Sequence, residues 1–300
     1  SAKFCGPSTI SGAWSVQFAE EFGSSRKIAF ISQHMYPFGA GNKVTDPAQG
    51  IERILSTVYY DKNYASFGPH LLALRLPYRL EETNNFYNGG AKDVSNTFAA
   101  ALWGLDYLYW WAGNQALGVN FHNGDTVAAG NASKPCLYAS FTTAPNGYIA
   151  HPLAYAIKAF DLGAHGQFIP SGASGPQAGG GGQNAAAGGA SKDLNLYQVA
   201  VLSPDKKVYI TLINDSHGAG ASASDVVLAP SSPSYTHADS ISLIAPKEDV
   251  TATTGVTLGG AAINADGSWQ GTWTPLPNSS SNKFAVKVPP ASAVIVRLIP

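Results

Sequence analysis

The stretch that decides the fold reads Leu76-Pro-Tyr-Arg-Leu-Glu-Glu-Thr-Asn-Asn-Phe-Tyr-Asn-Gly-Gly90. An apolar run, Leu71–Leu76, leads into it, and a glycine-rich turn ends it. This order predicts a buried strand over Leu71–Glu82 that delivers the Glu82 carboxylate to a loop of amides and aromatic rings. Barrels of parallel strands carry their reactive groups at the C-terminal strand ends, so Glu82 is the first candidate for a reacting residue.

The segments on either side of this stretch show the same pattern, an apolar run followed by polar residues. Apolar runs over Lys27–His34 and Ala116–His122 also end in polar clusters, and a further strand is expected at Ala2–Cys5. Helices are predicted over residues 8–23, 47–60, about 96–112 and 151–162, the first from Trp14, Phe18 and Phe22 at i, i+4 spacing and the third with Ser95 as N-cap. Alternating strands and helices predict a parallel sheet. A whole barrel needs eight such units and about 250 residues, so residues 1–164 predict the C-terminal half of a (β/α)8 TIM barrel, strands five to eight.

The pattern changes after residue 164. Residues 165–192 are rich in Gly, Ala, Ser and Gln and predict a flexible loop. Residues 193–300 contain short strand-like runs separated by Pro, Gly and Ser turns, which predict a β-sandwich domain. The runs are Leu196–Leu202, Lys207–Asn214, Asp225–Ala229, Ser240–Ala245 and Phe284–Val288.

Composition excludes several classes of protein. The net charge is −1 and charged residues make up 12%, so the chain lacks the basic face of a nucleic-acid-binding protein. We expect no membrane span, because no uncharged apolar stretch reaches the necessary length. The low charge, and sequons at Asn131, Asn214 and Asn278, favour a secreted glycoprotein. Cys5 and Cys136 could form one disulfide or remain two buried free thiols, and no Cys/His spacing resembles a metal site.

The chemistry that fits Glu82 is glycoside hydrolysis. A carboxylate among Asn, Tyr and Gly side chains can attack a sugar while its neighbours bind the hydroxyl groups. Strand alternation turns Glu81 and Arg79 to the face opposite Glu82, where Arg79 is expected to be structural, for example in an ion pair with an acidic neighbour, rather than to bind substrate. Asp106, inside an apolar helix, is expected to hydrogen-bond locally.

Several segments resemble glycoside hydrolase family 79, the family of β-glucuronidases and heparanases. They are Pro77–Gly90, Val94–Tyr107, Gly118–His122, Gln33–Pro37 and Val288–Arg297, in the family's order and across most of the chain. The resemblance is strongest around Glu82 and looser in the C-terminal part. The glycine-rich loop matches nothing in the family.

The resemblance implies a retaining β-glycosidase without a cofactor or metal, and Glu82 as its nucleophile. The family binds the carboxylate of a glucuronide with tyrosines and backbone amides, which here correspond to Tyr87, Asn88 and Gly89. It also implies a second substrate contact from Tyr36 and a third from Tyr138. His34 and His122 end strands beside the site, where they could bind the sugar or Glu82, or could pack structurally.

One departure from the family concerns the second catalytic group. The family's acid/base glutamate lies in an Asn-Glu motif at the end of strand four, and the chain contains no Asn-Glu. We therefore expect either a second polypeptide that supplies barrel strands one to four or a fragment of a longer protein. Two other functions stay open: hydrolysis of an uncharged β-glycoside such as a glucoside, and a non-catalytic carbohydrate-binding subunit.

Overall fold

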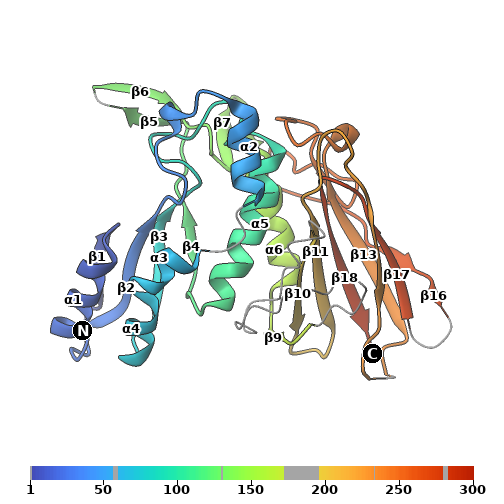
Figure 1. Ribbon diagram of the computed structural model, residues 1–300, viewed down its shortest axis with the longest axis horizontal. Coiled ribbons are helices and arrows are strands. Elements are labelled where there is room, and N and C mark those ends of the chain that lie inside the picture. The colour runs from blue at the N-terminus through green and yellow to red at the C-terminus, as the bar shows by residue number, and fades with distance from the viewer. Residues whose placement is uncertain (1, 57–59, 130, 172–195, 233, 280–282) are drawn as a thin grey trace.

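A four-stranded parallel sheet leads to Glu82. The computed structural model describes residues 2–56, 60–129, 131–171, 196–232, 234–279 and 283–300. The strands lie in the order β1-β2-β3-β4, each parallel to its neighbour. Their bounds are β1 Phe4–Thr9, β2 Ile28–Met35, β3 Tyr78–Thr83 and β4 Val119–Phe121. This sheet confirms the predicted βαβ pattern, and Figure 1 shows it as an open layer beside the helices.

Helices connect the strands of this sheet, and two hairpins follow its last strand. The helices are α1 Gly12–Phe22, α2 Pro47–Ser56, α3 Asp61–Ala65, α4 Gly68–Ala73, α5 Phe98–Gly113 and α6 Pro152–Gly163, with a 3-10 turn η1 at Gly41–Lys43. The hairpins follow β4 and consist of β5 Thr126–Ala129 with β6 Ala132–Pro135, and β7 Phe141–Ala144 with β8 Gly147–Ala150. Sequence analysis did not predict either hairpin.

Helix α5 lies at the centre of the molecule, between the parallel sheet and the C-terminal strands (Figure 1). All of its residues from Phe98 to Trp111 are buried, as expected of a helix that is apolar all round. Its first two amides are capped from a distant part of the chain, because Phe98 N donates to Ala252 O and Ala99 N donates to Val250 O, both at 2.8 Å. The C-terminal part thus satisfies helix ends that would otherwise lack partners.

The C-terminal part consists of two sheets. The larger has the order β14-β13-β18-β11-β10-β9, with β15 also paired to β13, and the smaller has the order β12-β17-β16. Buried side chains from both, among them Leu212, Val296, Phe284 and Val286, form one apolar cluster. The bounds are β9 Gln167–Ile169, β10 Leu196–Leu202, β11 Val208–Asn214, β12 Ser224–Leu228, β13 His237–Ile244, β14 Thr257–Leu258, β15 Thr274–Leu276, β16 Asn278–Ser279, β17 Lys283–Val288 and β18 Ser292–Ile299, with a 3-10 turn η2 at Pro246–Glu248.

The predicted strand over Leu71–Glu82 is wrong in its first half. The leucine run belongs to helix α4 and the turn after it, and β3 begins only at Tyr78. Leu and Ala favour helix, and a proline stands in the first turn. Arg75 at φ 57° then ends the helix, with Leu76 N bonded to Leu71 O and Arg75 N to Leu72 O, which is a Schellman motif.

Other boundaries also differ from the prediction: β1 runs over Phe4–Thr9, α1 begins only at Gly12, α2 ends at Ser56, and β4 covers only Val119–Phe121. Ser95 is not the cap of α5, since Thr97 occupies the N-cap position, and the Ser95 hydroxyl instead donates to Asn85 Oδ1. The expected loop over residues 165–192 contains strand β9, whose apolar side chain Phe168 packs on the core and whose backbone pairs with β10. Residues 172–192 of that loop lie outside the described part of the chain.

Two expectations about single residues are also settled. Cys5 and Cys136 are both free thiols, Cys5 exposed and Cys136 buried, so the disulfide is absent and the expectation of two buried thiols holds for one of them. The sequon at Asn214 is buried, with its amide bonded to the Ser222 and Val288 carbonyls, which excludes glycosylation of the folded chain there. Asn131 is exposed. No helix in the described ranges has the length and apolar character to cross a bilayer.

Candidate active site

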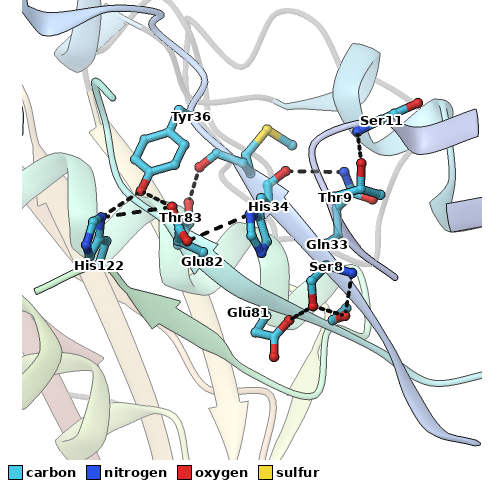
Figure 2. Close-up of polar contacts among 12 residues, drawn as sticks. Ser8, Thr9, Ser11, Gln33, His34, Tyr36, Glu81, Glu82, Thr83 and His122 are labelled. Carbon is cyan, nitrogen blue, oxygen red and sulfur yellow. Dashed lines mark hydrogen bonds and ion pairs between the residues drawn. The ribbon is translucent and has the colours of Figure 1, made fainter. Parts of the chain in front are cut away.

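Three neighbouring strands of the parallel sheet bring their C-terminal ends together around Glu82. The Tyr36 hydroxyl, just beyond β2, donates to Glu82 Oε1 at 2.8 Å. His34 Nδ1, from β2, lies 3.8 Å from Oε2, and His122 Nδ1, just beyond β4, lies 3.9 Å from Oε1. Figure 2 shows Tyr36, His34 and His122 converging on this carboxylate. The Glu82 side chain keeps 41% of its surface exposed, so a substrate can reach it.

Tyr36, Tyr138 and His122 form a cluster of polar groups beside Glu82. His122 Nδ1 lies 3.1 Å from the Tyr36 hydroxyl and 3.0 Å from the Tyr138 hydroxyl. Burial, with nearby Tyr138 and Glu82, raises the pKa of Tyr36 far above its ordinary value. Burial likewise raises the pKa of Tyr138 to about 12. Both phenols therefore stay protonated at any ordinary pH, and Tyr36 is a permanent donor to the Glu82 carboxylate.

Two buried asparagines hold the loop that follows Glu82. The Asn84 amide donates to the carbonyls of His122 and Tyr138, each at 3.3 Å, and so joins the β3 end to the β4 loop. Asn85 Oδ1 accepts from Ser95 Oγ at 2.7 Å, which closes the loop on itself. Sequence analysis missed these positioning roles, although the direct succession of Asn84 and Asn85 after Glu82 was a usable signal.

Thr83 holds the C-terminal end of β3 in place through its side-chain hydroxyl. Its hydroxyl donates to Met35 O at 2.6 Å and shares a hydrogen bond of 2.7 Å with the Tyr107 hydroxyl of α5. Tyr107 is fully buried. Thr83, the residue next to Glu82, is thus hydrogen-bonded both to β2 and to the central helix α5. These bonds fix the backbone from which the Glu82 side chain extends.

The turn Tyr87–Gly90 has an unusual backbone. Asn88, Gly89 and Gly90 all adopt positive φ, at 64°, 88° and 93°. The Gly89 N–H lies near the Tyr138 hydroxyl, where it acts to lower the pKa of Tyr138 against the larger opposing effect of burial. The Tyr87 side chain is 40% exposed, and its ring stands edge-on to Tyr36 with centroids 6.2 Å apart. The Gly89 N–H and the phenols of Tyr138 and Tyr87 therefore lie close to one another on the side of Glu82 that the turn borders.

The other charged side chains of β3 point away from this spot. Glu81 accepts from Ser8 of β1, and this hydrogen bond is the main reason that its pKa is lowered. Figure 2 shows Glu81 and Glu82 on opposite sides of the strand, as predicted. The predicted ion pair of Arg79 is wrong, since Arg79 Nε donates to the neutral side chain of Asn120 and no acidic group of the described residues lies within 4.0 Å.

The structure thus brings six of the eight predicted site residues into one polar cluster or its rim: Glu82, Tyr36, His34, His122, Tyr138 and Tyr87. Asn88 and Gly89 shape the turn that borders it. Within the described ranges, no group of three or more His, Cys, Asp and Glu side chains is placed to hold a metal ion. The arrangement supplies a carboxylate with two oriented imidazoles and several hydroxyl and amide donors.

The chain is similar in sequence to one curated glycosidase and in fold to several solved glycoside hydrolases. No family model matches the chain. A curated β-glucuronidase from Aspergillus niger is 33% identical over 107 residues, which cover 33% of this chain and 19% of the relative. The crystal structure of a 4-O-α-L-rhamnosyl-β-D-glucuronidase from Fusarium oxysporum matches with a TM-score of 0.67 and 21% identity, over 98% of this chain and 58% of that one.

More distant glycoside hydrolases share the same fold. A family 51 arabinofuranosidase from Xanthomonas axonopodis pv. citri has a TM-score of 0.61 at 15% identity, over 98% of this chain and 57% of that one. A family 44 xyloglucanase from Paenibacillus polymyxa has a TM-score of 0.55 at 14% identity, over 95% and 49%. The chain therefore spans about half the length of the solved structures that it matches, and its fold is similar to that part of these glycoside hydrolases, whose folds are of the TIM-barrel type.

Proposed function

We propose that this chain is the nucleophile-bearing part of a retaining β-glycoside hydrolase of the family 79 type, acting on β-linked glucuronides. Its residues 1–164 would form the C-terminal half of a (β/α)8 barrel, and residues 193–300 a β-sandwich joined to it through residues 165–192. The observation that carries the proposal is Glu82 at a strand end, oriented by the 2.8 Å hydrogen bond from Tyr36. The partial likeness to a β-glucuronidase and the shared fold support it.

In this reaction Glu82 attacks the anomeric carbon of the glycoside. A carboxylic acid on the other side of the bond protonates the leaving oxygen, and a covalent glycosyl–enzyme ester forms. The same second group then removes a proton from water, which attacks the ester and releases the sugar with its original configuration. The Tyr36 donor holds one Glu82 oxygen, so the other oxygen, on the His34 side, is free to attack.

Specificity for a glucuronide is supported by the groups that border Glu82. The Gly89 N–H and the Tyr138 hydroxyl are donors to a carboxylate, with Tyr87 exposed on the rim. Hydrolysis of an uncharged glucoside remains the second candidate, because phenols and amides also bind sugar hydroxyls. Tyr87→Phe separates the two: glucuronide turnover should fall far more than glucoside turnover, whereas equal losses would assign the site to neutral sugars.

The acid/base group must come from outside the chain's own β3 region, because Glu81 is turned toward Ser8. We propose that barrel strands one to four, on a second polypeptide or a preceding segment, supply it. Exposed apolar side chains beside the first strand support this, with Phe4 at 58%, Ile10 at 66% and Trp14 at 67% exposure. If no such partner exists, the remaining candidate is a non-catalytic carbohydrate-binding subunit.

The direct test replaces the nucleophile in the active assembly. Glu82→Ala should abolish hydrolysis of an aryl β-glucuronide, and added azide should restore release of the aryl group by attacking the vacated face of the sugar. The product would then be the α-glucuronyl azide. Glu81→Ala is the matched control and should keep most of the activity. Azide rescue in the Glu81 variant instead, or full activity without Glu82, would reject the assignment.

Secretion and glycosylation at Asn131 belong to the same proposal. The residue is exposed and lies in an Asn-Ala-Ser sequon, as attachment of a glycan requires. The Asn278 side chain lies outside the described residues. Neither a metal ion nor a cofactor enters the proposed reaction, since two carboxyl groups suffice for it.

A further inference from the structure

Two polar side chains stand out because the partners around them do not match the hydrogen bonds that they can make. Asp106, in the middle of α5, is 3% exposed, and neither of its carboxylate oxygens has a hydrogen-bond partner within the described part of the chain, so the local hydrogen bond expected from the sequence is absent. His122 is the opposite case, because its Nδ1 atom alone lies 3.1 Å from the Tyr36 hydroxyl and 3.0 Å from the Tyr138 hydroxyl. The positions of the hydrogens among these three groups follow from the distances.

The backbone holds the imidazole of His122 in place beside Glu82. The backbone N–H of His122 donates to Thr83 O at 2.8 Å, and its carbonyl accepts from the Asn84 side-chain amide at 3.3 Å. Thr83 and Asn84 directly follow Glu82 in the chain. His122 Nδ1 lies 3.9 Å from Glu82 Oε1, the oxygen that accepts from Tyr36, and Figure 2 shows Tyr36, His122 and Glu82 linked in one group.

The hydrogen of the Tyr36 hydroxyl decides which nitrogen of His122 carries a hydrogen. Tyr36 has one hydroxyl hydrogen, and its oxygen lies 2.8 Å from Glu82 Oε1. An ionised carboxylate only accepts, so this hydrogen lies between the two oxygens. The Tyr36 oxygen can then meet His122 Nδ1 only as an acceptor, which requires a hydrogen on Nδ1. A bare Nδ1 would set two lone pairs against each other 3.1 Å apart.

The other neighbours of the ring are compatible with a hydrogen on Nδ1. The Tyr138 oxygen, 3.0 Å from the same nitrogen, can share this hydrogen as a second acceptor, and its own hydroxyl hydrogen is then directed elsewhere. His122 Nε2 makes no hydrogen bond to a described residue, so no acceptor in that part of the chain favours a hydrogen on Nε2 instead.

We propose that His122 is a positioning residue, whose Nδ1–H donates to the Tyr36 oxygen and so keeps the Tyr36 hydroxyl turned toward Glu82. Both the neutral Nδ1–H ring and the charged ring can make this bond. A hydroxyl that accepts a hydrogen bond also donates a stronger one, so His122 strengthens the bond from Tyr36 to the carboxylate. The effect on catalysis rests on the proposed function, because His122 acts on Glu82 through Tyr36.

The first test observes the ring hydrogen directly. Nitrogen NMR of the purified protein, with isotope-labelled histidine and any segment that completes its barrel, distinguishes a hydrogen on Nδ1 from one on Nε2. The His122 signal is the one that is missing from His122→Asn. A hydrogen on Nδ1 is expected, and a ring whose only hydrogen lies on Nε2 would overturn the proposal. This reading needs no enzymatic activity, so it is independent of the proposed function.

The second test uses two substitutions of similar shape. Asn and Leu both branch at the carbon next to Cβ, but only Asn can donate, from an amide close to the place of Nδ1. His122→Leu should lower kcat for an aryl β-glucuronide by about 3- to 10-fold, the effect of losing one hydrogen bond, and His122→Asn should recover most of that loss. His165→Leu, at a histidine 78% exposed just beyond α6, is the control and should leave kcat unchanged.

A double substitution shows whether His122 acts through Tyr36. In Tyr36→Phe the hydroxyl is gone, so adding His122→Leu or His122→Asn should give equal activities. Equal losses from Leu and Asn in the unsubstituted background, or a Leu loss that persists undiminished in Tyr36→Phe, would overturn the positioning role. If His122→Leu fails to fold, the NMR reading and His122→Asn decide. Full activity without Glu82, together with a hydrogen on Nδ1, would reject the proposed function and leave the hydrogen-bond arrangement standing.

Discussion

At the scale of single residues, the orientation of Glu82 depends on Tyr36. Its hydroxyl was expected to contact the substrate carboxylate, yet it donates to Glu82 Oε1 and lies 3.1 Å from His122 Nδ1. The phenol therefore acts first on Glu82, the proposed nucleophile. Tyr138, whose hydroxyl reaches His122 but makes no hydrogen bond to Glu82 within the described residues, stays available to the substrate.

We predict that Tyr36→Phe lowers kcat for an aryl β-glucuronide by about 10- to 100-fold, the effect of losing one hydrogen bond to a charged group. KM should change little, because the substitution removes one oxygen atom and leaves the phenyl ring in place. Steady-state kinetics measure both values. Tyr148→Phe, at an exposed tyrosine of β8, is the control. An unchanged kcat together with a raised KM would contradict this prediction and show that Tyr36 contacts the substrate instead.

At the scale of elements, Asn123 shapes the loop that carries Tyr138. Its side-chain oxygen accepts from Ser140 N at 2.7 Å, Ser140 Oγ at 2.9 Å and Phe141 N at 3.2 Å. Its amide donates to Phe141 O at 3.0 Å. These bonds close the segment that contains hairpin β5–β6 and bring Tyr138 back over His122.

Asn123→Ala should therefore reduce kcat/KM for a glucuronide by about 10-fold or more, with a smaller loss for the matching glucoside, because Tyr138 loses its position. Asn123→Asp keeps the three acceptor bonds and should restore most of the difference. Asn264→Ala, which removes an asparagine hydrogen-bonded to Ser268 in a remote turn, serves as the control. Equal losses on both substrates would show that Asn123 supports only the fold.

Elements with a clear local signal were predictable from the sequence. Strand β10 matches its predicted bounds, and α5 and α6 differ by one or two residues, because long apolar runs and simple periodicity decide them. The leucine run of α4 was misassigned since its periodicity does not distinguish a short buried helix from a strand. Hairpin β7–β8 was missed although Asn146-Gly147 is a turn signal in the sequence. Side-chain hydrogen bonds of Asn123 and Asp125 with distant residues, which the sequence does not reveal, hold the region in place.

The site residues that lie at the ends of parallel strands could be predicted from the sequence. Glu82, His34, Tyr36 and His122 each stand at or just beyond the end of a parallel strand, and parallel strands bring such ends together. Tyr138 comes from a loop, and Asn84 and Ser95 act through buried hydrogen bonds that depend on the tertiary fold. Of these, only the direct succession of Asn84 and Asn85 after Glu82 was a signal in the sequence.

At the scale of the whole molecule, the parallel sheet is open. Strands β1 and β4 each pair on one side only within the described residues. Helix α1 shows the same openness, since Trp14 and Phe22 of its predicted apolar stripe are 67% and 46% exposed. Exposed strand edges and apolar helix faces favour aggregation.

We predict that this chain expressed alone is insoluble or misfolded, and that co-expression with the segment supplying strands one to four restores a soluble protein. Size-exclusion chromatography and a thermal melt measure this. A denaturing intact-mass spectrum of active material should then show the complementing polypeptide, or a longer chain that contains it. A monomeric, cooperative melt of the lone chain would contradict the prediction.

The carbonyls of Val250 and Ala252, which cap the first turn of α5, have a consequence for biosynthesis. A ribosome releases this helix well before it has made the residues that complete the helix start. The start of α5, whose Tyr107 holds Thr83 beside Glu82, is therefore completed only after the residues around Val250 and Ala252 have been made. A prematurely terminated product would carry the proposed nucleophile Glu82 on a helix whose first amides lack these partners.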